Sequence, residues 1–236
     1  MSEKGILYGI GVGPGDPELL TLKAVRALGE VDVIFAAAST KNDYSTALDI
    51  ARPHLRPDVR VEQLGFPMTK DKDILETAWR KNADIVSTAL NQGQNGAFLT
   101  LGDPLTYSTW GYLQRTLLAM NPAIRLQAIP GITSFHAAAA RIGLVLAESK
   151  ESLLITSGVA DPEILERQLD VADNAVILKA YKNFEEIRAT LERLRLDDKT
   201  VLVSRLGMDG ESILMDIKDA PATPHYFSLA LVKKQV

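Results

Sequence analysis

The sequence contains no cysteine, and its charges are neither strongly biased nor clustered. Without cysteine there can be no disulfide framework, thiolate nucleophile, thiolate zinc site or iron–sulfur cluster. The net charge of −4 and the scattered Lys and Arg residues give no electrostatic footprint for nucleic acid. We therefore expect no nucleic-acid partner.

Long apolar runs are also missing. No run of about 18 uncharged apolar residues is present to span a bilayer, so we expect no membrane partner. The first residues, Met1 to Gly5, lead into a strand-like segment without a secretory hydrophobic region, which favours the cytoplasm. The 236 residues, 46% hydrophobic and 24% charged, are typical of a globular protein with one large domain or two small ones.

Short apolar segments alternate with amphipathic segments along the first half of the chain. This pattern predicts strands over residues 6–12, 31–37, 59–64 and 96–101, and helices over 18–28, 44–54 and 71–91. Such an alternation predicts an α/β fold with a mostly parallel sheet that helices cover on both faces.

The second half has the same kinds of element in a different order. It predicts strands over 126–129, 152–157, 175–180 and 200–204, and helices over 134–142, 162–169 and 184–194. Two late segments, 212–217 and 226–233, flank a turn-rich stretch and predict antiparallel strands, hence a mixed sheet. A boundary near Asn121-Pro122 would give an N-terminal α/β domain over 1–121 and a C-terminal α/β domain over 122–236.

A glycine-rich segment, Gly9-Ile10-Gly11-Val12-Gly13-Pro14-Gly15-Asp16-Pro17, follows the first predicted strand. Its glycines permit positive φ and allow another group to approach the backbone closely. Asp16 is placed to cap the next helix, with Pro17 at its first position. A dinucleotide fingerprint would need its third glycine where Pro14 or Asp16 stands, and a P-loop would need a Gly-Lys-Ser/Thr that is absent. The segment is either a tight turn or a ligand loop of another kind.

A second segment, Leu99 to Thr109, repeats the order strand, Gly-Asp-Pro, helix. Asp161-Pro162 repeats the pair once more, which indicates that Asp-Pro is a helix-start device in this chain. The second segment differs because three hydroxyl residues and a tyrosine follow within one turn. Such an uncharged lining suits a neutral nucleoside or an amino-acid headgroup better than a phosphate.

A third segment, Ile129-Pro130-Gly131-Ile132-Thr133-Ser134, joins a strand to an alanine-rich helix, where Thr133 or Ser134 is placed as the cap. All three segments follow predicted strands. In open α/β sheets ligands gather outside the carboxyl ends of the strands, so we expect these three loops to meet there.

Taken together, these residues resemble the tetrapyrrole (corrin/porphyrin) methyltransferase family. The resemblance runs from Gly9 to Lys234. Within the family, the segments Phe98 to Asp103, Tyr107 to Trp110, Thr133 to Phe135 and Pro224 to Ser228 look like the C20-methylating branch of cobalamin synthesis. The Ser-Thr-Trp and Thr-Ser-Phe details resemble its anaerobic, cobalt-early members more than its aerobic ones.

The resemblance implies two α/β domains with S-adenosylmethionine (SAM) in the cleft between them, in a homodimer. It implies methyl transfer to C20 of cobalt-factor II, with S-adenosylhomocysteine as the product. The SAM contacts it implies are Pro14, Leu101, Gly102, Asp103, Thr106, Ser108, Thr109, Thr133, Ser134, Tyr181, Leu206 and His225. The chain departs from many relatives at Lys182-Asn183 and at Met208 to Gly210, which follow two of the adenosine contacts.

The substrate is a small-molecule tetrapyrrole with many carboxylates, so a net-negative protein needs local cations to bind it. Lys41 is the candidate carboxylate contact, and Tyr107 is a further substrate candidate. No residue is identified as a catalytic general base. His54, His136 and His225 lack zinc-ligand spacing, so we expect no protein-bound metal and expect cobalt to arrive inside the substrate.

Two alternatives stay open on the sequence. The first is C20 methylation of metal-free precorrin-2, as in the aerobic pathway. The second is a non-catalytic tetrapyrrole carrier or chelatase partner on the same scaffold, which would not bind SAM.

Overall fold

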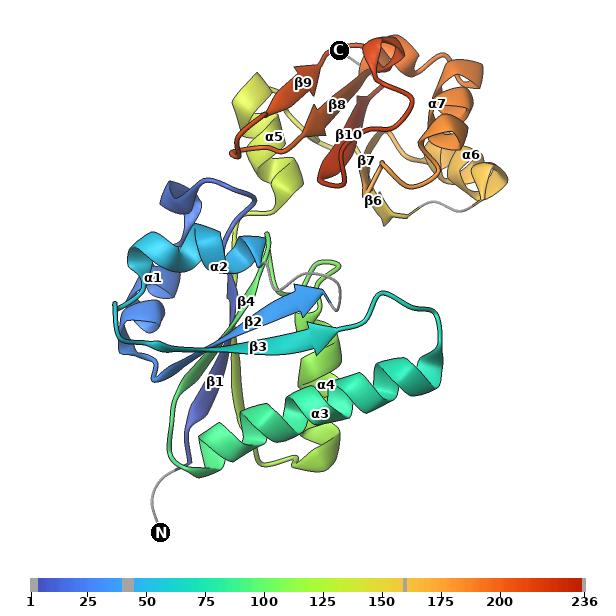
Figure 1. Cartoon of the computed structure of the whole chain (residues 1–236). Coiled ribbons are helices and arrows are strands. Elements are labelled where there is room, and N and C mark those ends of the chain that lie inside the picture. The colour runs from blue at the N-terminus through green and yellow to red at the C-terminus, as the bar shows by residue number, and fades with distance from the viewer. Residues whose placement is uncertain (1–3, 40–44, 159–160, 235–236) are drawn as a thin grey trace. The chain divides into compact units, whose positions relative to one another are not determined.

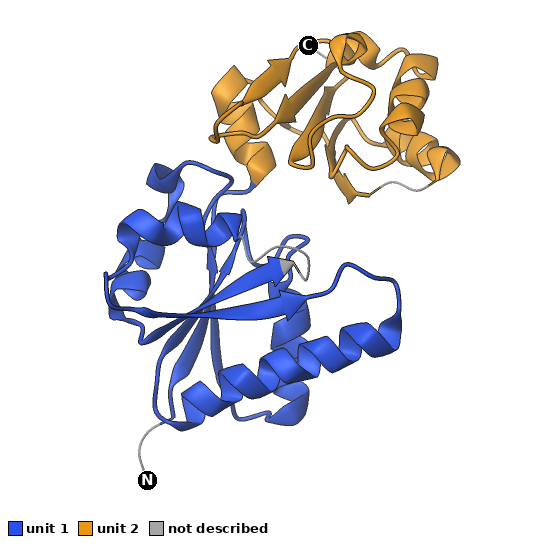
Figure 2. Cartoon of the chain, in the orientation of Figure 1, with its two compact units in different colours: residues 1–133 blue, residues 134–236 orange. Residues whose placement is uncertain are grey.

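The structure is a computed structural model that describes residues 4–39, 45–158 and 161–234 (Figure 1). The chain divides into two compact units, Met1–Thr133 (unit 1) and Ser134–Val236 (unit 2), which Figure 2 shows in separate colours. Each unit has one five-stranded sheet with helices packed against it. The predicted α/β fold class is confirmed.

Unit 1 is built on a parallel sheet in the order β3-β2-β4-β1-β5. β4 is buried along its whole length because β1 and β2 flank it and helices cover it. The elements of unit 1 are β1 (Ile6–Gly11), η1 (Pro17–Leu19, a 3-10 turn), α1 (Leu22–Glu30), β2 (Val33–Ser39), α2 (Thr46–Ala51), η2 (Arg52–His54), β3 (Arg60–Phe66), α3 (Lys72–Asn91), β4 (Gly96–Thr100), α4 (Trp110–Met120) and β5 (Arg125–Ile129).

Helices cover both faces of the unit 1 sheet. On one face α3 and α4 pack against a cluster that includes Leu7, Phe35, Phe98 and Trp110, all fully buried. α1 contacts β1 and α2 contacts β2 on the other side of the sheet (Figure 1). This confirms the predicted arrangement of a parallel sheet between two helical layers.

The helix predicted over 18–28 is wrong at its start, because the chain makes two separate elements there. The Asp16 carboxylate accepts a hydrogen bond from the Glu18 N–H and caps only the short turn η1. The Thr21 hydroxyl then accepts from the Ala24 N–H and caps α1, which begins at Leu22. A second capping side chain inside the predicted helix therefore restarts it.

Unit 2 has a mixed sheet in the order β6-β7-β10-β8-β9. β6 and β7 are parallel, and β10 runs antiparallel to both β7 and β8, as predicted for the end of the chain. The elements of unit 2 are α5 (Ser134–Ile142), β6 (Leu153–Ser157), α6 (Pro162–Val171), β7 (Asn174–Leu178), α7 (Phe184–Arg193), η3 (Asp197–Lys199), β8 (Thr200–Ser204), β9 (Ser212–Leu214), η4 (Ile217–Asp219) and β10 (Ser228–Lys233).

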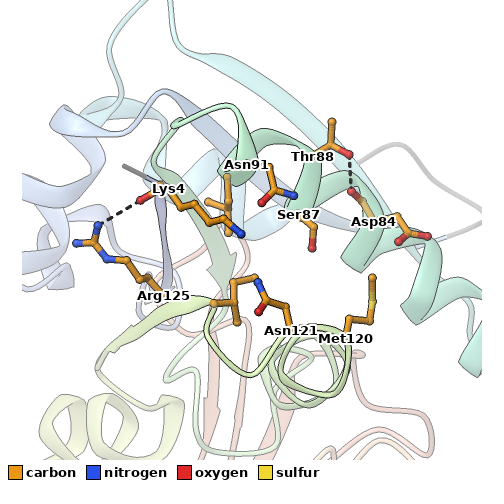
Figure 3. Close-up of a pocket in the computed structure, with 11 residues that line it drawn as sticks. Lys4, Asp84, Ser87, Thr88, Asn91, Met120, Asn121 and Arg125 are labelled. Carbon is orange, nitrogen blue, oxygen red and sulfur yellow. Dashed lines mark hydrogen bonds between the residues drawn. The ribbon is translucent and has the colours of Figure 1, made fainter. Parts of the chain in front are cut away.

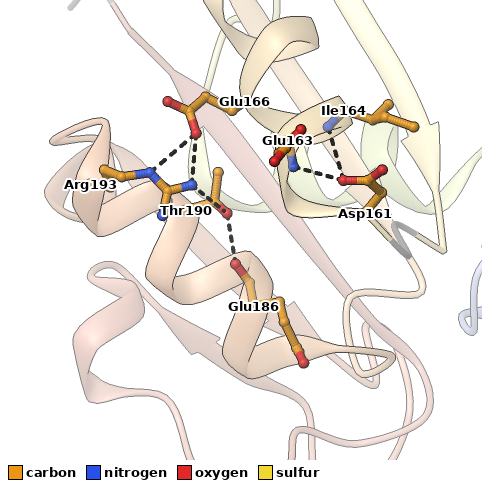
Figure 4. A network of polar contacts seen from close by, with 7 residues as sticks. All are labelled: Asp161, Glu163, Ile164, Glu166, Glu186, Thr190 and Arg193. Atoms are coloured by element: carbon orange, nitrogen blue, oxygen red, sulfur yellow. Dashed lines mark hydrogen bonds and ion pairs between the residues drawn. The ribbon is translucent and has the colours of Figure 1, made fainter.

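The core of unit 2 lies between its sheet and the helices α6 and α7. At the surface of these helices Arg193 pairs with Glu166 at 2.7 Å and so joins α7 to α6 (Figure 4). Both side chains are more than one-third exposed, so the pair contributes at most about 1 kcal/mol. The apolar packing beneath it holds the two helices in place.

The division between the units falls later than the sequence indicated. β5 pairs in parallel with β1, with Arg125 opposite Ile6 and Ile129 opposite Ile10. The predicted boundary at Asn121-Pro122 therefore lies inside unit 1, which ends at Thr133. A boundary that divides the chain into two halves of similar size does not take account of the pairing of β5 with β1.

Gly9 and Gly29 provide a paired test of the core. A Cβ at Gly9 would lie 2.5 Å from the Trp110 ring, whereas a Cβ at Gly29 in α1 would meet nothing within 4 Å. We expect Gly9→Ala to lower the free energy of unfolding by about 1–3 kcal/mol, because Trp110 must move. Gly29→Ala should raise it by about 0.5–1 kcal/mol, because alanine is the better helix residue. Urea unfolding measures both; equal effects would contradict the packing described.

Candidate functional site

Three loops meet at the carboxyl edge of the unit 1 sheet. They follow β1, β4 and β5, and they contain the three segments singled out in the sequence. The Val12 N–H donates to the Thr100 carbonyl at 2.9 Å. Gly13 and Gly102 then exchange two backbone hydrogen bonds, of 3.3 and 2.8 Å, in an antiparallel bridge. The expected meeting of the loops is thus present in unit 1.

At Gly11 and Gly131, neighbouring backbone fills the space that a side chain would take. A Cβ at Gly131 would lie 2.2 Å from the Gly102 carbonyl oxygen, and a Cβ at Gly11 would lie 2.5 Å from the same atom. Gly13 and Gly102 also have positive φ, of 79° and 64°. The close approach that the sequence predicted is therefore made by other loops of the protein. The Gly102 N–H donates to the Gly13 carbonyl, so Gly102 has no free amide to offer a ligand.

Asp103 does not begin a helix, in contrast to the sequence expectation. α4 begins only at Trp110, and the segment between them is a loop. One carboxylate oxygen of Asp103 accepts from the Leu105 N–H at 2.8 Å, and the other accepts from the Gly131 N–H at 3.1 Å. The Asp103 side chain therefore joins the loop after β4 to the loop after β5.

Hydroxyl groups follow Asp103 in the same loop. Thr106, Ser108 and Thr109 are half-buried, as is Thr133 in the loop after β5. The Ser108 hydroxyl accepts from the Trp110 N–H at 3.1 Å, so Ser108 also supports the start of α4. Tyr107 between them has a φ of 49° and a half-exposed ring. Non-glycine residues held in this region of φ are strained, and such strain is concentrated at functional sites.

The remaining predicted contacts of unit 1 are Pro14, Leu101 and Lys41. Pro14 is buried in the loop after β1, and Leu101 is half-buried directly after β4. Lys41 lies outside the described residues, so the structure places nothing there. Ser134 is the first residue of α5 and belongs to unit 2.

Tyr181, Leu206 and His225 lie at one edge of the unit 2 sheet, where β7 and β8 end and β10 begins. The Ala180 N–H donates to the Ser228 carbonyl at 3.0 Å, and the Arg205 N–H donates to the Phe227 carbonyl at 2.9 Å. Leu206 is buried, Tyr181 is half-buried and His225 is exposed. The structure thus gathers these three predicted residues within unit 2.

Sequence reasoning missed two side chains at this edge. The Tyr226 ring lies 4.8 Å from the Tyr181 ring, centroid to centroid. Burial raises the pKa of both phenols. The Arg205 Nε is buried without a hydrogen-bond partner among the described residues, and its backbone has a φ of 54°. Tyr226 lies within Pro224 to Ser228, one of the segments that carry the family resemblance. Nothing in the sequence near Arg205 distinguishes it from a surface arginine.

The histidines do not gather into a metal site. His54 contacts the Pro17 carbonyl at 3.1 Å through Nε2 and is half-buried, while His136 is exposed. The His225 Nδ1 accepts from the Phe227 N–H at 3.1 Å. Across residues 4–39, 45–158 and 161–234 no group of three His, Asp or Glu residues could hold a metal ion. Over the same residues no helix is both long and apolar enough to cross a membrane.

A separate pocket of about 340 Å³ lies in unit 1, where β1 and β5 begin and α3 and α4 end (Figure 3). Lys4, Asp84, Asn91, Asn121 and Arg125 contribute its polar lining. None of the predicted site residues lines it. In a parallel sheet this is the amino end of the strands, opposite to the edge where the three loops meet.

The fold agrees with the comparisons to known proteins. A model of the tetrapyrrole (corrin/porphyrin) methylases matches residues 6–221. The cobalt-precorrin-2 C(20)-methyltransferase of Salmonella typhimurium is 35% identical over 234 residues, which are 98% of this chain and 97% of that protein. The precorrin-2 C(20)-methyltransferase of a Sinorhizobium species is 33% identical, over 97% of this chain and 95% of that protein.

Solved structures show the same fold at lower identity. A uroporphyrin-III C-methyltransferase from Thermus thermophilus, complexed with S-adenyl homocysteine, has a TM-score of 0.67 at 23% identity and covers 98% of both chains. A cobalt precorrin-4 methyltransferase has a TM-score of 0.72 at 17% identity, covering 97% of this chain and 94% of that one. The match of the family model over most of the chain identifies it as a member of the tetrapyrrole methylase family.

Glu211 gives a pH-dependent test of the loop that carries Leu206. Its carboxylate accepts from the Gly207 N–H at 2.8 Å and from the Arg141 Nε at 2.9 Å. These bonds lower the pKa of Glu211 from its ordinary value, the Gly207 bond most strongly. A lowered pKa stabilises the fold above the unfolded-state pKa, about 4.3, and the effect is lost as the pH falls through the folded-state pKa.

We therefore expect Glu211→Gln to be less stable than the wild type at pH 7, with the difference shrinking below about pH 4.3. Chemical denaturation from pH 7 to pH 3 measures it. A difference that is constant over this range would contradict the assignment of the two hydrogen bonds to the ionised carboxylate.

Proposed function

We propose that this protein transfers a methyl group from SAM to C20, the meso carbon, of cobalt-factor II in the anaerobic branch of cobalamin synthesis. The observation that carries the proposal is identity of about one-third over nearly the whole chain to relatives named for C20 methylation. Such similarity extends through both units, so it includes both groups of candidate site residues.

The lining of the candidate site fits SAM in chemical character. SAM brings a methyl group already activated on a positively charged sulfur. We propose that the loops of unit 1 hold it through Pro14, through Leu101 to Asp103, and through the hydroxyls of Thr106, Ser108, Thr109 and Thr133. We further propose that Ser134 and the edge residues Tyr181, Leu206 and His225 of unit 2 also contact the cofactor.

Little covalent chemistry is then left to the protein. Holding two reacting groups in line can lower a barrier by about 7–11 kcal/mol through orientation alone. The chain has no cysteine that could intercept the methyl group. We assign no general base for the C20 proton.

The acceptor is the point at which the two enzymatic alternatives differ. Relatives named for the cobalt-containing acceptor include the Salmonella protein and one from Methanocaldococcus jannaschii, at 35% and 34% identity. Together with the Ser108-Thr109-Trp110 detail, they favour a cobalt-containing acceptor at the precorrin-2 level over metal-free precorrin-2. The Lys41 ammonium is proposed to bind a carboxylate of the macrocycle. Action in the cytoplasm and assembly as a homodimer remain predictions.

Methyl transfer to matched acceptors tests the proposal. We expect the purified protein and SAM to methylate cobalt-factor II faster than the metal-free macrocycle, as read by mass and absorption spectra of the product. Faster transfer to the metal-free acceptor would establish the aerobic alternative. Equilibrium dialysis without acceptor should show SAM binding; a macrocycle carrier would bind none.

Thr106 and Thr116 form a matched pair for the cofactor contact. Thr106 lies in the loop after β4, whereas the Thr116 hydroxyl donates to the Tyr112 carbonyl within α4. We expect Thr106→Val to weaken S-adenosylhomocysteine binding about fivefold, because one hydrogen bond is lost. Thr116→Val should leave the affinity within about twofold. Isothermal titration calorimetry measures both, and equal affinities would remove Thr106 from the site.

A further inference from the structure

The Asp103 carboxylate uses its two oxygens on two different loops. One oxygen accepts from Leu105 in its own loop, and the other accepts from Gly131, 28 residues further along the chain. A carboxylate that accepts two backbone N–H groups forms charge-assisted hydrogen bonds, which are stronger than neutral ones. The spacing between these two loops is therefore set by a side chain as well as by backbone packing.

The other two Asp-Pro pairs of the chain, Asp16-Pro17 and Asp161-Pro162, use their carboxylates differently. The Asp16 bond to the Glu18 N–H ends on Oδ1. Both bonds of Asp161, to the Glu163 and Ile164 N–H groups, also end on one oxygen, Oδ1 (Figure 4). These two residues are N-caps, for which a single acceptor oxygen is enough. Asp103 needs two.

We propose that Asp103 is a positioning residue of the SAM site and acts through this two-sided clamp. The inference rests on the proposed function, because only that function identifies SAM as the ligand of the clamped loops. One clamped loop carries Thr106, Ser108 and Thr109, and the other carries Thr133. Loosening the clamp lets these hydroxyls move apart, so the affinity for the cofactor falls even where the fold is retained.

Asparagine is the substitution that separates the clamp from a cap. The side-chain amide has one acceptor oxygen, and its NH₂ group would face a backbone N–H donor. Asp103→Asn therefore keeps one of the two bonds and loses the other. Asparagine is as good an N-cap as aspartate, so Asp16→Asn and Asp161→Asn retain their bonds and serve as matched controls.

The experiment measures loop order and affinity in the same variants. We expect Asp103→Asn to bind S-adenosylhomocysteine about tenfold more weakly. We expect faster hydrogen exchange at the Gly131 amide, measured by NMR without ligand. Both control variants should match the wild type in affinity and in exchange at Gly131.

Two results would overturn the inference. Unchanged exchange at Gly131 in Asp103→Asn would show that the clamp does not order the loop. Faster exchange with wild-type affinity would show that the clamp does not position the cofactor site. A wild-type protein that binds no S-adenosylhomocysteine would instead remove the proposed function, and with it the ligand of the clamp, while the exchange data would still report the clamp itself.

Discussion

The loops after β1, β4 and β5 touch one another through their backbones, and this contact requires glycine. At Gly11 and Gly131 any side chain would overlap the Gly102 carbonyl. The order of the strands makes the contact available, because β1 lies between β4 and β5 in the sheet. The glycines then let the three loops pack closely against one another, and two of these loops carry half-buried hydroxyl residues.

Because the loops pack in this way, their glycines have a different role from the glycines of a phosphate-binding loop. In phosphate-binding loops, glycine leaves backbone N–H groups free to face the ligand. Here the Gly102 N–H is committed to Gly13, and the Gly131 N–H is committed to the Asp103 carboxylate. Neither of these glycine N–H groups is therefore free to face a ligand, and the same loops carry the half-buried hydroxyl residues Thr106, Ser108, Thr109 and Thr133. Such a surface suits an uncharged nucleoside and a zwitterionic amino acid, the two ends of SAM.

Local sequence was sufficient to predict most of the fold and the meeting of three loops at the candidate site. Alternating apolar segments predicted the strands, and the three loops were predicted to meet because parallel strands end at one edge. The Asp-Pro pairs show the limit: Asp16 and Asp161 cap local N–H groups, whereas the partner of Asp103 lies in a loop that only tertiary structure brings near. The pairing of β5 with β1 likewise depends on a non-local contact. The same holds for the burial of the Arg205 Nε, which has no hydrogen-bond partner among the described residues.

Amide chemical-shift mapping with S-adenosylhomocysteine tests whether the three loops of unit 1 bind the cofactor. We expect the largest shifts in the loops after β1, β4 and β5 of unit 1 and at the Tyr181, Leu206 and His225 edge of unit 2. Shifts confined to the pocket of Lys4, Asp84 and Arg125 at the amino end of the unit 1 strands, or no shifts at saturating ligand, would contradict it.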